Sequence, residues 1–467
     1  MIADLKPYAE YKESGLPWLG KVPEHWEVKR AKSIFQRVDI RSKTGQEELL
    51  TVSSARGIVP RKTANVTMFK AESSLGYKLC WPGDLVINSL WAWAGGLGVS
   101  KHHGIISSAY GVYRIREDAP MLPAFIHEVA RSSSFNWELK VRSKGVWISR
   151  LQLTDISFLD APMHIPPVVE QEAIVRFLDW ANGRLERAIR AKRKVIVLLN
   201  EQKQAIIHRA VTRGLDPSVP LKPSGIPWLG DVPAHWTVMP LKHAFTSMDY
   251  GISDPTFDAG RIRVLGMGQI KDGEITIPED GGVNTVDPSL FLKNGDLLFN
   301  RTNSAALVGK VGIFRGHNTP VTFASYLVRL RPKSGFDSEY LNFVLNCSVI
   351  LNVARQSSIP SLHQSNLNPA RYGRLAIAVP NHEEQQKILR HLIKVCQPLN
   401  DAIRLAELTA QRIAEYRTRL VADVVTGKLD VREAAAKLLV EEQTIEPEEL
   451  VEDDSEMIED EITEPVG

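Results

Sequence analysis

Two charged residues near the start of this 467-residue sequence have the spacing of half a catalytic site. Glu27 and Lys29 flank a single residue, as in the Glu-x-Lys half of a metal-dependent nuclease site, but no aspartate stands at a suitable distance upstream. The equivalent positions later in the chain, Thr237 and Met239, carry neither charge. The pattern therefore does not indicate a nuclease. A nuclease with an unrecognised site stays an alternative that metal-dependent cleavage by the purified chain would establish.

Glycine-rich loops that hold cofactors are incomplete here. Gly266 and Gly268 form a Gly-x-Gly pair with no third glycine at phosphate-loop spacing, and such a pair is weak evidence in any sequence. The stretch 254–257 (Asp-Pro-Thr-Phe) lacks the second proline of the motif with which amino-directed DNA methyltransferases hold their target base. No Gly-x-x-x-x-Gly-Lys-Ser/Thr loop for ATP occurs. We expect the chain to bind no cofactor and to catalyse nothing by itself.

Metal ligands and disulfides are not indicated either. His102 and His103 are adjacent, so their side chains do not share one face of an element as zinc ligands need to. The three cysteines, Cys80, Cys347 and Cys396, are scattered and odd in number, which favours neither a disulfide framework nor a metal site.

Length and charge set broad limits. The chain suits two or three domains. It has no apolar run of 18 residues and no signal pattern at its start, so we expect a cytoplasmic protein. The stretch 441–467 holds 13 acidic residues and no Lys or Arg, which leaves 57 basic and 42 acidic residues, a net charge of +15, in residues 1–440. This basic body fits a polyanion such as DNA, although an ordinary basic protein would show the same balance.

The elements that would position any functional residue occur twice. The stretch 14–28 contains Ser-Gly-Leu-Pro-Trp-Leu-Gly, Val-Pro and His-Trp, and 224–238 repeats it with Ile in place of the first Leu. A second match joins Gly83-Asp84-Leu85 to Gly295-Asp296-Leu297, in each case a tight turn before an apolar strand. Matched glycines, prolines and tryptophans predict that two similar globular units are built on one frame.

Two long amphipathic stretches follow these units. Apolar positions step by four and three residues in both, which is a heptad seam in the same register. At about 1.5 Å per residue, each helix of about 43 residues would be about 64 Å long, and its natural partner is the other copy. Pro398 lies inside the second stretch, so we expect a kink or break there. The predicted seam residues are Ile174, Leu178, Leu185, Val195, Leu199 and Ile206 in the first helix, and Ile388, Leu392, Val395, Leu399, Ile413 and Leu420 in the second.

The predicted fold class is therefore mixed α/β (α+β), with two similar domains, two long antiparallel helices as a coiled-coil spacer, and a pseudo-twofold internal repeat. The predicted boundaries are 1–165 for the first domain, 166–216 for the first helix, 217–379 for the second domain and 380–432 for the second helix. After a short helix around 431–442, the acidic remainder of the 433–467 tail reads as disordered.

Between the matched strands, the two copies carry different loops. Differing loops on similar frames suit two modules that bind different targets, although drift would look the same. In the major groove of DNA, Arg and Lys read guanine, whereas Asn and Gln read adenine. The candidate DNA-binding residues are Arg56, Arg61, Lys62, Arg142, Lys144, Trp147 and Arg150 in the first unit, and Arg301, Asn303, Lys310, Arg355, Gln356, His363 and Gln364 in the second.

Taken together, four duplicated features resemble the specificity subunit of Type I restriction-modification enzymes: the Ser-Gly-x-Pro-Trp-Leu-Gly and His-Trp openings, the Gly-Asp-Leu strands, the Pro…Glu-Gln helix starts and the Val-Thr…Leu-Asp helix ends. They span about residues 10–432. The resemblance implies two target-recognition domains that each read half of a split double-stranded DNA sequence, with the helices as a ruler. The chain would be non-catalytic and would bind no metal. Modification subunits would bring S-adenosylmethionine, and restriction subunits would bring ATP with Mg.

Two features depart from the family pattern, namely Pro398 and the acidic tail. A scaffold whose duplicated domains bind proteins is the alternative from another functional class. The salt dependence of binding to duplex DNA separates the two hypotheses, because only counterion release from DNA gives a steep slope.

Overall fold

The computed structural model describes residues 5–16, 19–54, 56–64, 73–145, 151–361 and 364–444. The chain forms two compact units. Unit 1 contains residues 1–191 and 409–467, and unit 2 contains residues 192–408. Because these limits fall inside the two long helices, each helix contributes one half to each unit. Each unit is therefore built from its own globular part and a pair of helix halves.

The two long helices are continuous. Helix α4 (Val168–Arg213) has 46 residues and α8 (His382–Val425) has 44, so the predicted long helices are confirmed. Pro398 lies within α8, and the helix runs through it without the break that the sequence suggested. The side chain of Pro398 is exposed, so water can hydrogen-bond the carbonyl group that the proline leaves without a donor.

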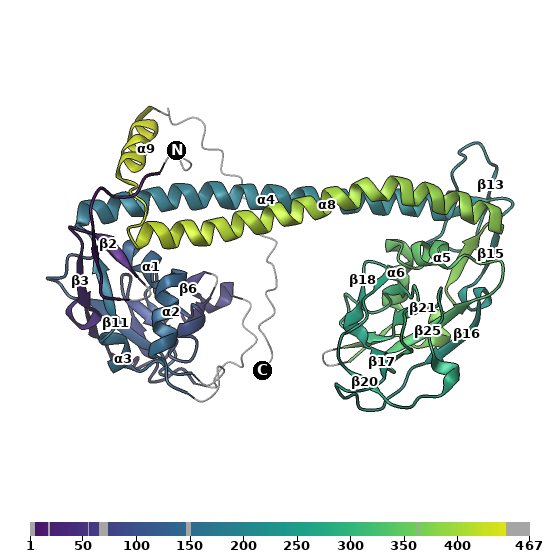
Figure 1. Ribbon diagram of the computed structural model, residues 1–467, viewed down its shortest axis with the longest axis horizontal. Helices are drawn as coiled ribbons and strands as arrows, with labels where there is room; N and C mark the ends of the chain where they lie inside the picture. The colour runs from purple at the N-terminus through teal and green to yellow at the C-terminus, as the bar shows by residue number, and fades with distance from the viewer. Residues whose placement is uncertain are drawn as a thin grey trace. The chain divides into compact units, whose positions relative to one another are not determined.

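Within each unit, the two helix halves pack side by side in opposite directions (Figure 1). In unit 1 the first half of α4 meets the last half of α8, and Arg417 donates to Glu186 across the pair at 2.8 Å. In unit 2 the end of α4 meets the start of α8, and both contribute to one core that includes Ile207 and Ile388. Because the start of one helix lies beside the end of the other in both units, the two helices are antiparallel.

Burial of the seam is deepest where the helices rest on a globular core. Ile174 and Leu178 of α4 and Ile388, Leu392 and Leu420 of α8 are buried. The remaining seam residues of the prediction, apart from Val195, are half-buried: Leu185, Leu199, Ile206, Val395, Leu399 and Ile413.

Val195 does not fit a buried seam, because it is 44% exposed. In unit 2, Ile207 and Cys396 are also buried, and each lies one residue beyond a predicted seam position, Ile206 or Val395, that is only half-buried. A straight α-helix has 3.6 residues per turn, so a seam drawn with a period of 3.5 drifts by about 20° per heptad. The shift also reflects a second contact, since these helix halves pack on the domain as well as on each other.

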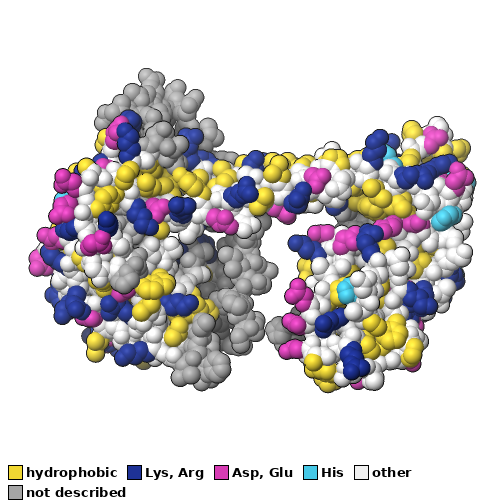
Figure 2. Space-filling model, in the orientation of Figure 1, with side chains coloured by type: hydrophobic (Ala, Val, Ile, Leu, Met, Phe, Trp, Pro, Cys, Tyr) yellow, Lys and Arg dark blue, Asp and Glu magenta, His cyan; other side chains and the backbone are white. Residues whose placement is uncertain are grey.

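The outer faces of the helices carry apolar as well as charged side chains (Figure 2). In unit 2, Val197, Leu198 and Ile393 are 49%, 54% and 52% exposed. No helix in the described part of the chain is both long and apolar enough to span a bilayer.

The remaining helices of unit 1 are α1 (Pro123–Arg131), α2 (Ser133–Arg142), α3 (Asp155–Leu159) and α9 (Arg432–Thr444), with short 3-10 turns η2 (Ala31–Ser33), η3 (Arg61–Thr63) and η4 (Ala92–Ala94). Its strands are β1 (Tyr11–Glu13), β2 (Lys21–Pro23), β3 (Glu27–Arg30), β4 (Phe35–Arg37), β5 (Leu50–Ser53), β6 (Gly57–Pro60), β7 (Lys78–Cys80), β8 (Leu85–Ile87), β9 (Leu97–Val99), β10 (Gly104–Ile106), β11 (Gly111–Ile115) and β12 (Pro162–Ile165).

Besides its parts of α4 and α8, unit 2 has helices α5 (Ser338–Leu345), α6 (Ser348–Gln356) and α7 (Pro369–Tyr372), and 3-10 turns η6 (Leu241–Ala244), η7 (Met267–Gln269) and η8 (Pro288–Leu290). Its strands are β13 (Leu221–Pro223), β14 (Asp231–Pro233), β15 (Thr237–Pro240), β16 (Phe245–Tyr250), β17 (Ile262–Leu265), β18 (Ile270–Lys271), β19 (Glu274–Ile275), β20 (Gly282–Val283), β21 (Leu297–Asn300), β22 (Thr302–Asn303), β23 (Val311–Ile313), β24 (Val321–Phe323), β25 (Leu327–Pro332), β26 (Ile359–Pro360), β27 (Ser365–Asn366) and β28 (Ala376–Val379).

One sheet arrangement recurs in both units. Unit 1 has the strand order β4-β11-β8-β9, and unit 2 has the longer order β16-β25-β21-β23-β19-β18. The strand after each predicted Gly-Asp turn, β8 or β21, is fully buried in the centre of its sheet, and Gly83 and Gly295 take the positive φ that such a turn requires. The mixed α/β fold with its internal repeat is confirmed.

In unit 1, a segment near the start of the described chain contacts the segment that follows α8. Tyr11 donates from its hydroxyl to the carbonyl oxygens of Gly427 and Lys428, just past the end of α8. Lys6 and Asp430 form a β-bridge, and α9 follows with Ala435 in the unit 1 core and with Leu438 buried. In unit 2 the corresponding place, between the end of α4 and β13, is continuous chain.

Candidate nucleic-acid interface

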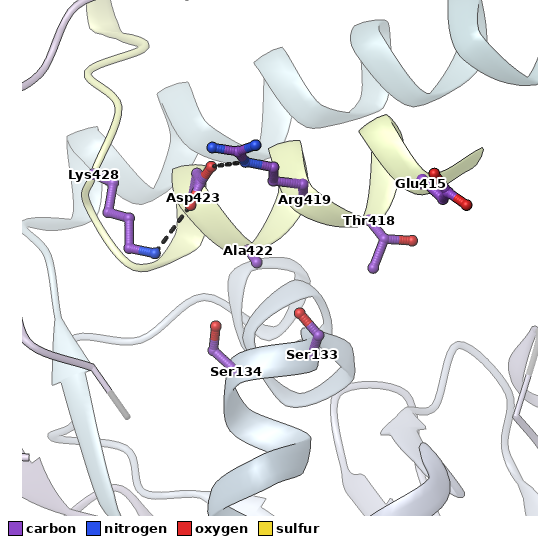
Figure 3. Close-up of a pocket in the computed structure, with 8 residues that line it drawn as sticks. All are labelled: Ser133, Ser134, Glu415, Thr418, Arg419, Ala422, Asp423 and Lys428. Atoms are coloured by element: carbon purple, nitrogen blue, oxygen red, sulfur yellow. Dashed lines mark hydrogen bonds and ion pairs between the residues drawn. The ribbon is translucent and has the colours of Figure 1, made fainter. Parts of the chain in front are cut away.

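A groove in unit 1 is a candidate catalytic site, because it is lined by serine hydroxyls, carboxylates and cationic side chains. It has a volume of about 490 Å³ and lies between the start of α2 and the last turns of α8 (Figure 3). Asp423 is held between Arg419 at 3.4 Å and Lys428 at 3.1 Å, and two serines face it from α2. The lining includes no His or Cys, so it holds no Ser-His or Cys-His pair of the kind that activates a nucleophile.

Metal binding finds no support in the described residues, among which no cluster of three His, Cys, Asp or Glu side chains occurs. The thiol of Cys80 is buried, and burial raises its pKa to about 11. A thiol with that pKa stays protonated near neutral pH and is a poor nucleophile.

The repeated His-Trp motif anchors each domain to a long helix. Glu170, in the first turn of α4, accepts a hydrogen bond from Trp26 Nε1 at 2.9 Å and contacts His25 Nε2 at 2.8 Å. The equivalent His-Trp pair of unit 2 contacts Glu384, in the first turn of α8, at 2.8 and 3.0 Å. Both glutamates also complement the positive end of the helix dipole. The residues that make the motif recognisable are therefore structural.

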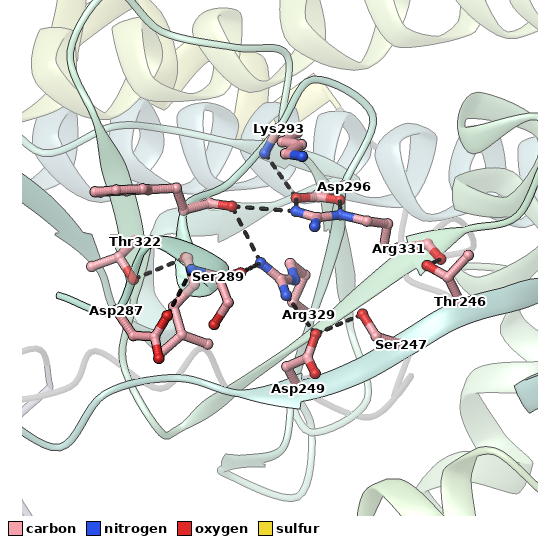
Figure 4. Close-up of polar contacts among 12 residues, drawn as sticks. Thr246, Ser247, Asp249, Asp287, Ser289, Lys293, Asp296, Thr322, Arg329 and Arg331 are labelled. Atoms are coloured by element: carbon pink, nitrogen blue, oxygen red, sulfur yellow. Dashed lines mark hydrogen bonds and ion pairs between the residues drawn. The ribbon is translucent and has the colours of Figure 1, made fainter.

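The repeated Gly-Asp turn is fixed in the same way. Asp84, which is 1% exposed, accepts two hydrogen bonds from Arg114 at 2.8 and 2.9 Å. In unit 2, Asp296 accepts two from Arg331 at 2.8 and 2.7 Å (Figure 4). Hydrogen bonds to Asp296 raise the pKa of the Arg331 guanidinium above its ordinary value. Since these motif residues hold the frame, residues that read a target must come from the parts that differ.

The structure gathers most unit 2 candidates around one small sheet, with strand order β22-β27-β26. Thr302 and Asn303 pair with Asn366 and Ser365, and the latter two also pair with β26. This pairing brings together segments that are about sixty residues apart in sequence, and Arg301, Asn303, Arg355, Gln356 and Gln364 lie in or beside it.

Arg301 is the candidate with the most defined surroundings. Its guanidinium lies over the ring of Tyr250 at 5.2 Å from the centroid, and Nη1 donates to the carbonyl of Ser325 at 3.2 Å. Tyr250 is 47% exposed and Tyr326 is 46% exposed. The planar guanidinium is thus held by stacking while it remains partly open to solvent, which suits recognition of a planar acceptor.

The other unit 2 candidates differ in accessibility. Asn303 is only 9% exposed and its Oδ1 accepts from Ser304 N at 2.8 Å, so little of its side chain faces solvent. Arg355 donates to the carbonyl of Ala306 at 2.6 Å. Gln356 and Gln364 are exposed, and Lys310 is half-exposed. His363 lies outside the described residues.

In unit 1, three candidates surround the β5–β6 hairpin. Arg56, in its turn, is exposed and donates to the carbonyl of Thr63. Arg61 and Lys62 follow on η3, and Lys62 pairs with Glu48 at 2.7 Å while its side chain is 76% exposed. Lys62 therefore remains available to an external anion.

Arg142 is a weaker candidate than its residue type suggested. Its Nε donates to Glu138 at 2.5 Å, its Nη1 lies 3.6 Å from Asp160, and its side chain is 26% exposed. Lys144 is exposed and its backbone pairs with Gln152. Trp147 and Arg150 lie outside the described residues.

An aromatic stack that the candidate set missed lies in the divergent loop of unit 1. Trp91 and Trp93 stack at 5.9 Å between centroids, and Lys140 from α2 lies 5.9 Å from the Trp93 ring. Trp91 is 41% exposed. The signal in the sequence was two tryptophans in a loop whose counterpart in the other copy has none.

Comparisons with known proteins come from sequence and from structure. No family model matches the chain. The StySPI specificity subunit of a type I restriction enzyme from Salmonella potsdam is 22% identical over 88% of this chain and 94% of its own length. The EcoKI specificity subunit from Escherichia coli is 21% identical over 74% of this chain and 75% of its own length. The MjaX specificity subunit from Methanocaldococcus jannaschii is 27% identical over 35% of this chain, a match that spans 40% of that relative. A solved chain from a study of type I R-M system assembly and conformational transition, 16% identical, has a similar fold, with a TM-score of 0.64 over 87% of this chain and 99% of that one.

Proposed function

The chain is a relative of the specificity subunits of type I restriction enzymes, and from that premise we propose that it is the DNA sequence-specificity subunit of such a complex. In this role it binds a bipartite target in double-stranded DNA, one half-site per unit, and has no catalytic activity of its own. It directs methyltransferase subunits and ATP-dependent restriction subunits to that target.

The observation that carries the proposal is one frame with two different surfaces. The Gly-Asp turns and the His-Trp motifs make the same hydrogen bonds in both units, with the same donor and acceptor atoms. The loops beside them differ in sequence. The position that holds Arg301 in unit 2 is Ser89 in unit 1, because their carbonyl groups accept from the equivalent amides of Leu367 and Leu153. Two duplicated domains that share their structural hydrogen bonds but differ in their exposed loop residues are suited to recognise different half-sites.

The exposed apolar side chains of the long helices support the proposal that partner subunits bind there. Val197, Leu198 and Ile393 lie on the solvent side of the helix pair in unit 2, where burial against a partner subunit would remove apolar surface from water. The methyltransferase subunits that would dock there bring S-adenosylmethionine, and the restriction subunits bring ATP and Mg.

The test is binding of the full chain, in complex with its methyltransferase partner, to mixed-sequence duplex DNA over a range of salt concentrations. A DNA-specificity subunit gives a logarithmic affinity that falls steeply and linearly with the logarithm of salt. Methylome sequencing of a strain that carries the pair then shows a split target sequence. A shallow salt dependence with no split motif would favour the protein-binding scaffold instead.

A further inference from the structure

A second groove lies on unit 2, beside the small β22-β27-β26 sheet around which the candidate DNA-binding residues gather. None of those candidate residues lines the groove. It has a volume of about 400 Å³ and lies between the end of β16 and the short α7 segment. Lys242, Tyr250, Asn368 and Arg374 are among its lining residues. Tyr250 is also the ring over which Arg301 lies, so the groove continues directly from that residue.

Gly373 keeps the groove open. A Cβ at this position would come within 3.1 Å of Lys242 Cβ and 3.3 Å of Met248 Sδ, so a larger side chain would occupy the floor. The registers of β12 with β3 and of β28 with β15 show that the equivalent residue in unit 1 is Leu159. Leu159 is partly buried against the core of unit 1, so the duplicated frame does not itself require the groove.

The charge around the groove also differs between the units. By the same registers, Arg374 of unit 2 corresponds to Asp160 of unit 1, and Pro369 corresponds to Asp155. The pairing of β16 with β25 and of β4 with β11 makes Asp39 the counterpart of Tyr250. Unit 2 thus has aromatic, neutral or basic residues at three positions where unit 1 has carboxylates.

In unit 1 these carboxylates pair with three arginines of the same region. Asp155 contacts Arg37 at 2.9 Å, Asp39 contacts Arg41 at 3.0 Å, and Asp160 pairs with Arg30. In unit 2, the exposed side chains of Lys242 and Arg374 form no hydrogen bond or ion pair with another residue in the described ranges. Two cations therefore face one groove, and no acidic residue is among those that line it.

We propose that this groove of unit 2 binds the phosphate oxygens of the DNA backbone next to the second half-site, with Lys242 and Arg374 as the phosphate ligands. The proposal rests on the proposed function, since it assumes that unit 2 lies on duplex DNA. Contacts to phosphate fix the register of a protein on the duplex and carry no base information. The groove would set the register from which Arg301, at its edge, reaches a base. Unit 1 has no equivalent, so the two half-sites are bound with unequal electrostatic contributions.

The experiment compares two double variants of the full chain in complex with its methyltransferase partner. Lys242→Gln with Arg374→Gln removes the two groove cations, and Lys32→Gln with Arg30→Gln removes the same charge from the equivalent region of unit 1. Each complex is titrated onto a fluorescent mixed-sequence duplex at several salt concentrations. The unit 2 variant should lower the slope of log affinity against log salt by about 1.8, since each phosphate contact on B-DNA contributes about 0.9. The unit 1 variant should leave the slope within about 0.5 of the wild-type value.

Three other outcomes overturn the assignment. A steep wild-type slope that neither double variant changes, or that both reduce equally, leaves the proposed function standing and removes the groove from it. A loss of affinity confined to the complex's own target sequence, with none on mixed-sequence DNA, makes the groove a base-reading site instead. A wild-type complex with no salt-dependent duplex binding overturns the proposed function and the groove together. Unchanged melting temperatures in both variants, expected because all four side chains are exposed, exclude misfolding as the cause.

Discussion

An ion pair in unit 2 with a buried arginine has an apolar counterpart in unit 1, so equivalent positions of the internal repeat are packed in two different ways. Arg329, which is 3% exposed, donates to Asp249 at 2.5 Å and to the carbonyl of Ser289 at 2.7 Å (Figure 4). The strand registers place Val112 and Val38 at the equivalent positions of unit 1, where they belong to a small apolar core. Removal of one partner from a buried ion pair is costly, whereas joint replacement by apolar residues often is not.

Asp249→Val alone should therefore destabilise unit 2 more than the double change with Arg329→Met. The single variant leaves a buried guanidinium without its carboxylate, which should lower the free energy of unfolding by about 2 kcal/mol after allowance for the partial exposure of Asp249. The double variant should recover about half of that loss, since methionine fills the volume of the arginine stem. Urea unfolding of the three proteins, followed by circular dichroism, measures both values. A double variant less stable than the single one would show that the carbonyl contacts of Arg329 dominate.

Two buried histidines give unit 1 a defined pH dependence. His164 is fully buried and stacks on Trp26 at 5.4 Å, and burial lowers its pKa to about 4. Burial, together with the nearby Arg131 and Lys101, lowers the pKa of His127 to about 4 as well. The unfolded chain binds these protons near pH 6.5, so the unfolded state gains protons first as the pH falls.

The stability of unit 1 should be complete above about pH 6.5 and fall as the pH decreases toward 4. Each histidine contributes about 1.4 kcal/mol per pH unit within that window. His164→Asn should remove one proton from the measured slope, and the exposed His317→Asn in unit 2 should leave it unchanged. Urea midpoints between pH 4 and 7 measure the slope. A slope that His164→Asn leaves unchanged would contradict the buried, neutral state of His164.

At the scale of elements, the C-terminal helix α9 completes unit 1. Ala435 of α9 belongs to the unit 1 core, Leu438 one turn further on is 3% exposed, and its neighbour Leu439 is 39% exposed. Arg432, at the start of the helix, lies over the Tyr8 ring at 5.0 Å and contacts Asp430. The helix thus helps to hold the start of the chain against the end of α8.

Leu438→Ala should destabilise unit 1 by about 3 kcal/mol, because it removes buried methyl groups and leaves a cavity. Leu439→Ala changes the next residue by the same atoms and should cost less than about 0.5 kcal/mol. Differential scanning calorimetry of both variants makes the comparison. Equal effects of the two substitutions would mean that α9 does not pack on unit 1 in solution.

The features that the sequence predicted correctly are those that depend on local sequence patterns. The long helices, their glycine ends and the duplicated Gly-Asp turns follow from periodicity and turn chemistry, which a segment carries within itself. The seam was displaced by one residue at Ile207 and Cys396, because packing on the domain is a tertiary contact that a heptad pattern does not encode. At Pro398 the sequence predicted a kink or break, and no break occurs, because the carbonyl group that loses its donor lies on an exposed face where water can hydrogen-bond it.

The candidate site was less predictable, because accessibility depends on partners distant in sequence. Arg142 has a suitable side chain but is held by Glu138, one helical turn away, and by the more distant Asp160, whereas Asn303 is restricted by the strand pairing of β22. The groove beside Arg301 was missed because it depends on Gly373 and Arg374, which come next to Lys242 only through the pairing of β15 with β28. The groove becomes recognisable only when equivalent residues of the two units are compared, and that comparison requires the strand registers.

At the scale of the whole molecule, the continuity of α4 and α8 bears on the proposed role of the two helices as a spacer between two half-site readers. Both helices extend between the parts that pack on unit 1 and the parts that pack on unit 2 without interruption. An added heptad keeps the apolar stripe on the same side, because seven residues make almost two full turns. It also lengthens a helix by about 10 Å, which corresponds to about three base pairs of DNA.

Insertion of one heptad after Val195 in α4 and another after Leu408 in α8 should therefore lengthen the unread gap of the target by about three base pairs and leave both half-sites unchanged. The half-sites stay the same because no residue of either reading surface is altered. Methylome sequencing of a strain that carries the variant and its methyltransferase partner reads the gap and the half-sites together. Insertion of four residues at the same places is the control, since it rotates the stripe by about 40° and should abolish methylation. Altered half-site sequences in the heptad variant would contradict the assignment of one half-site to each unit.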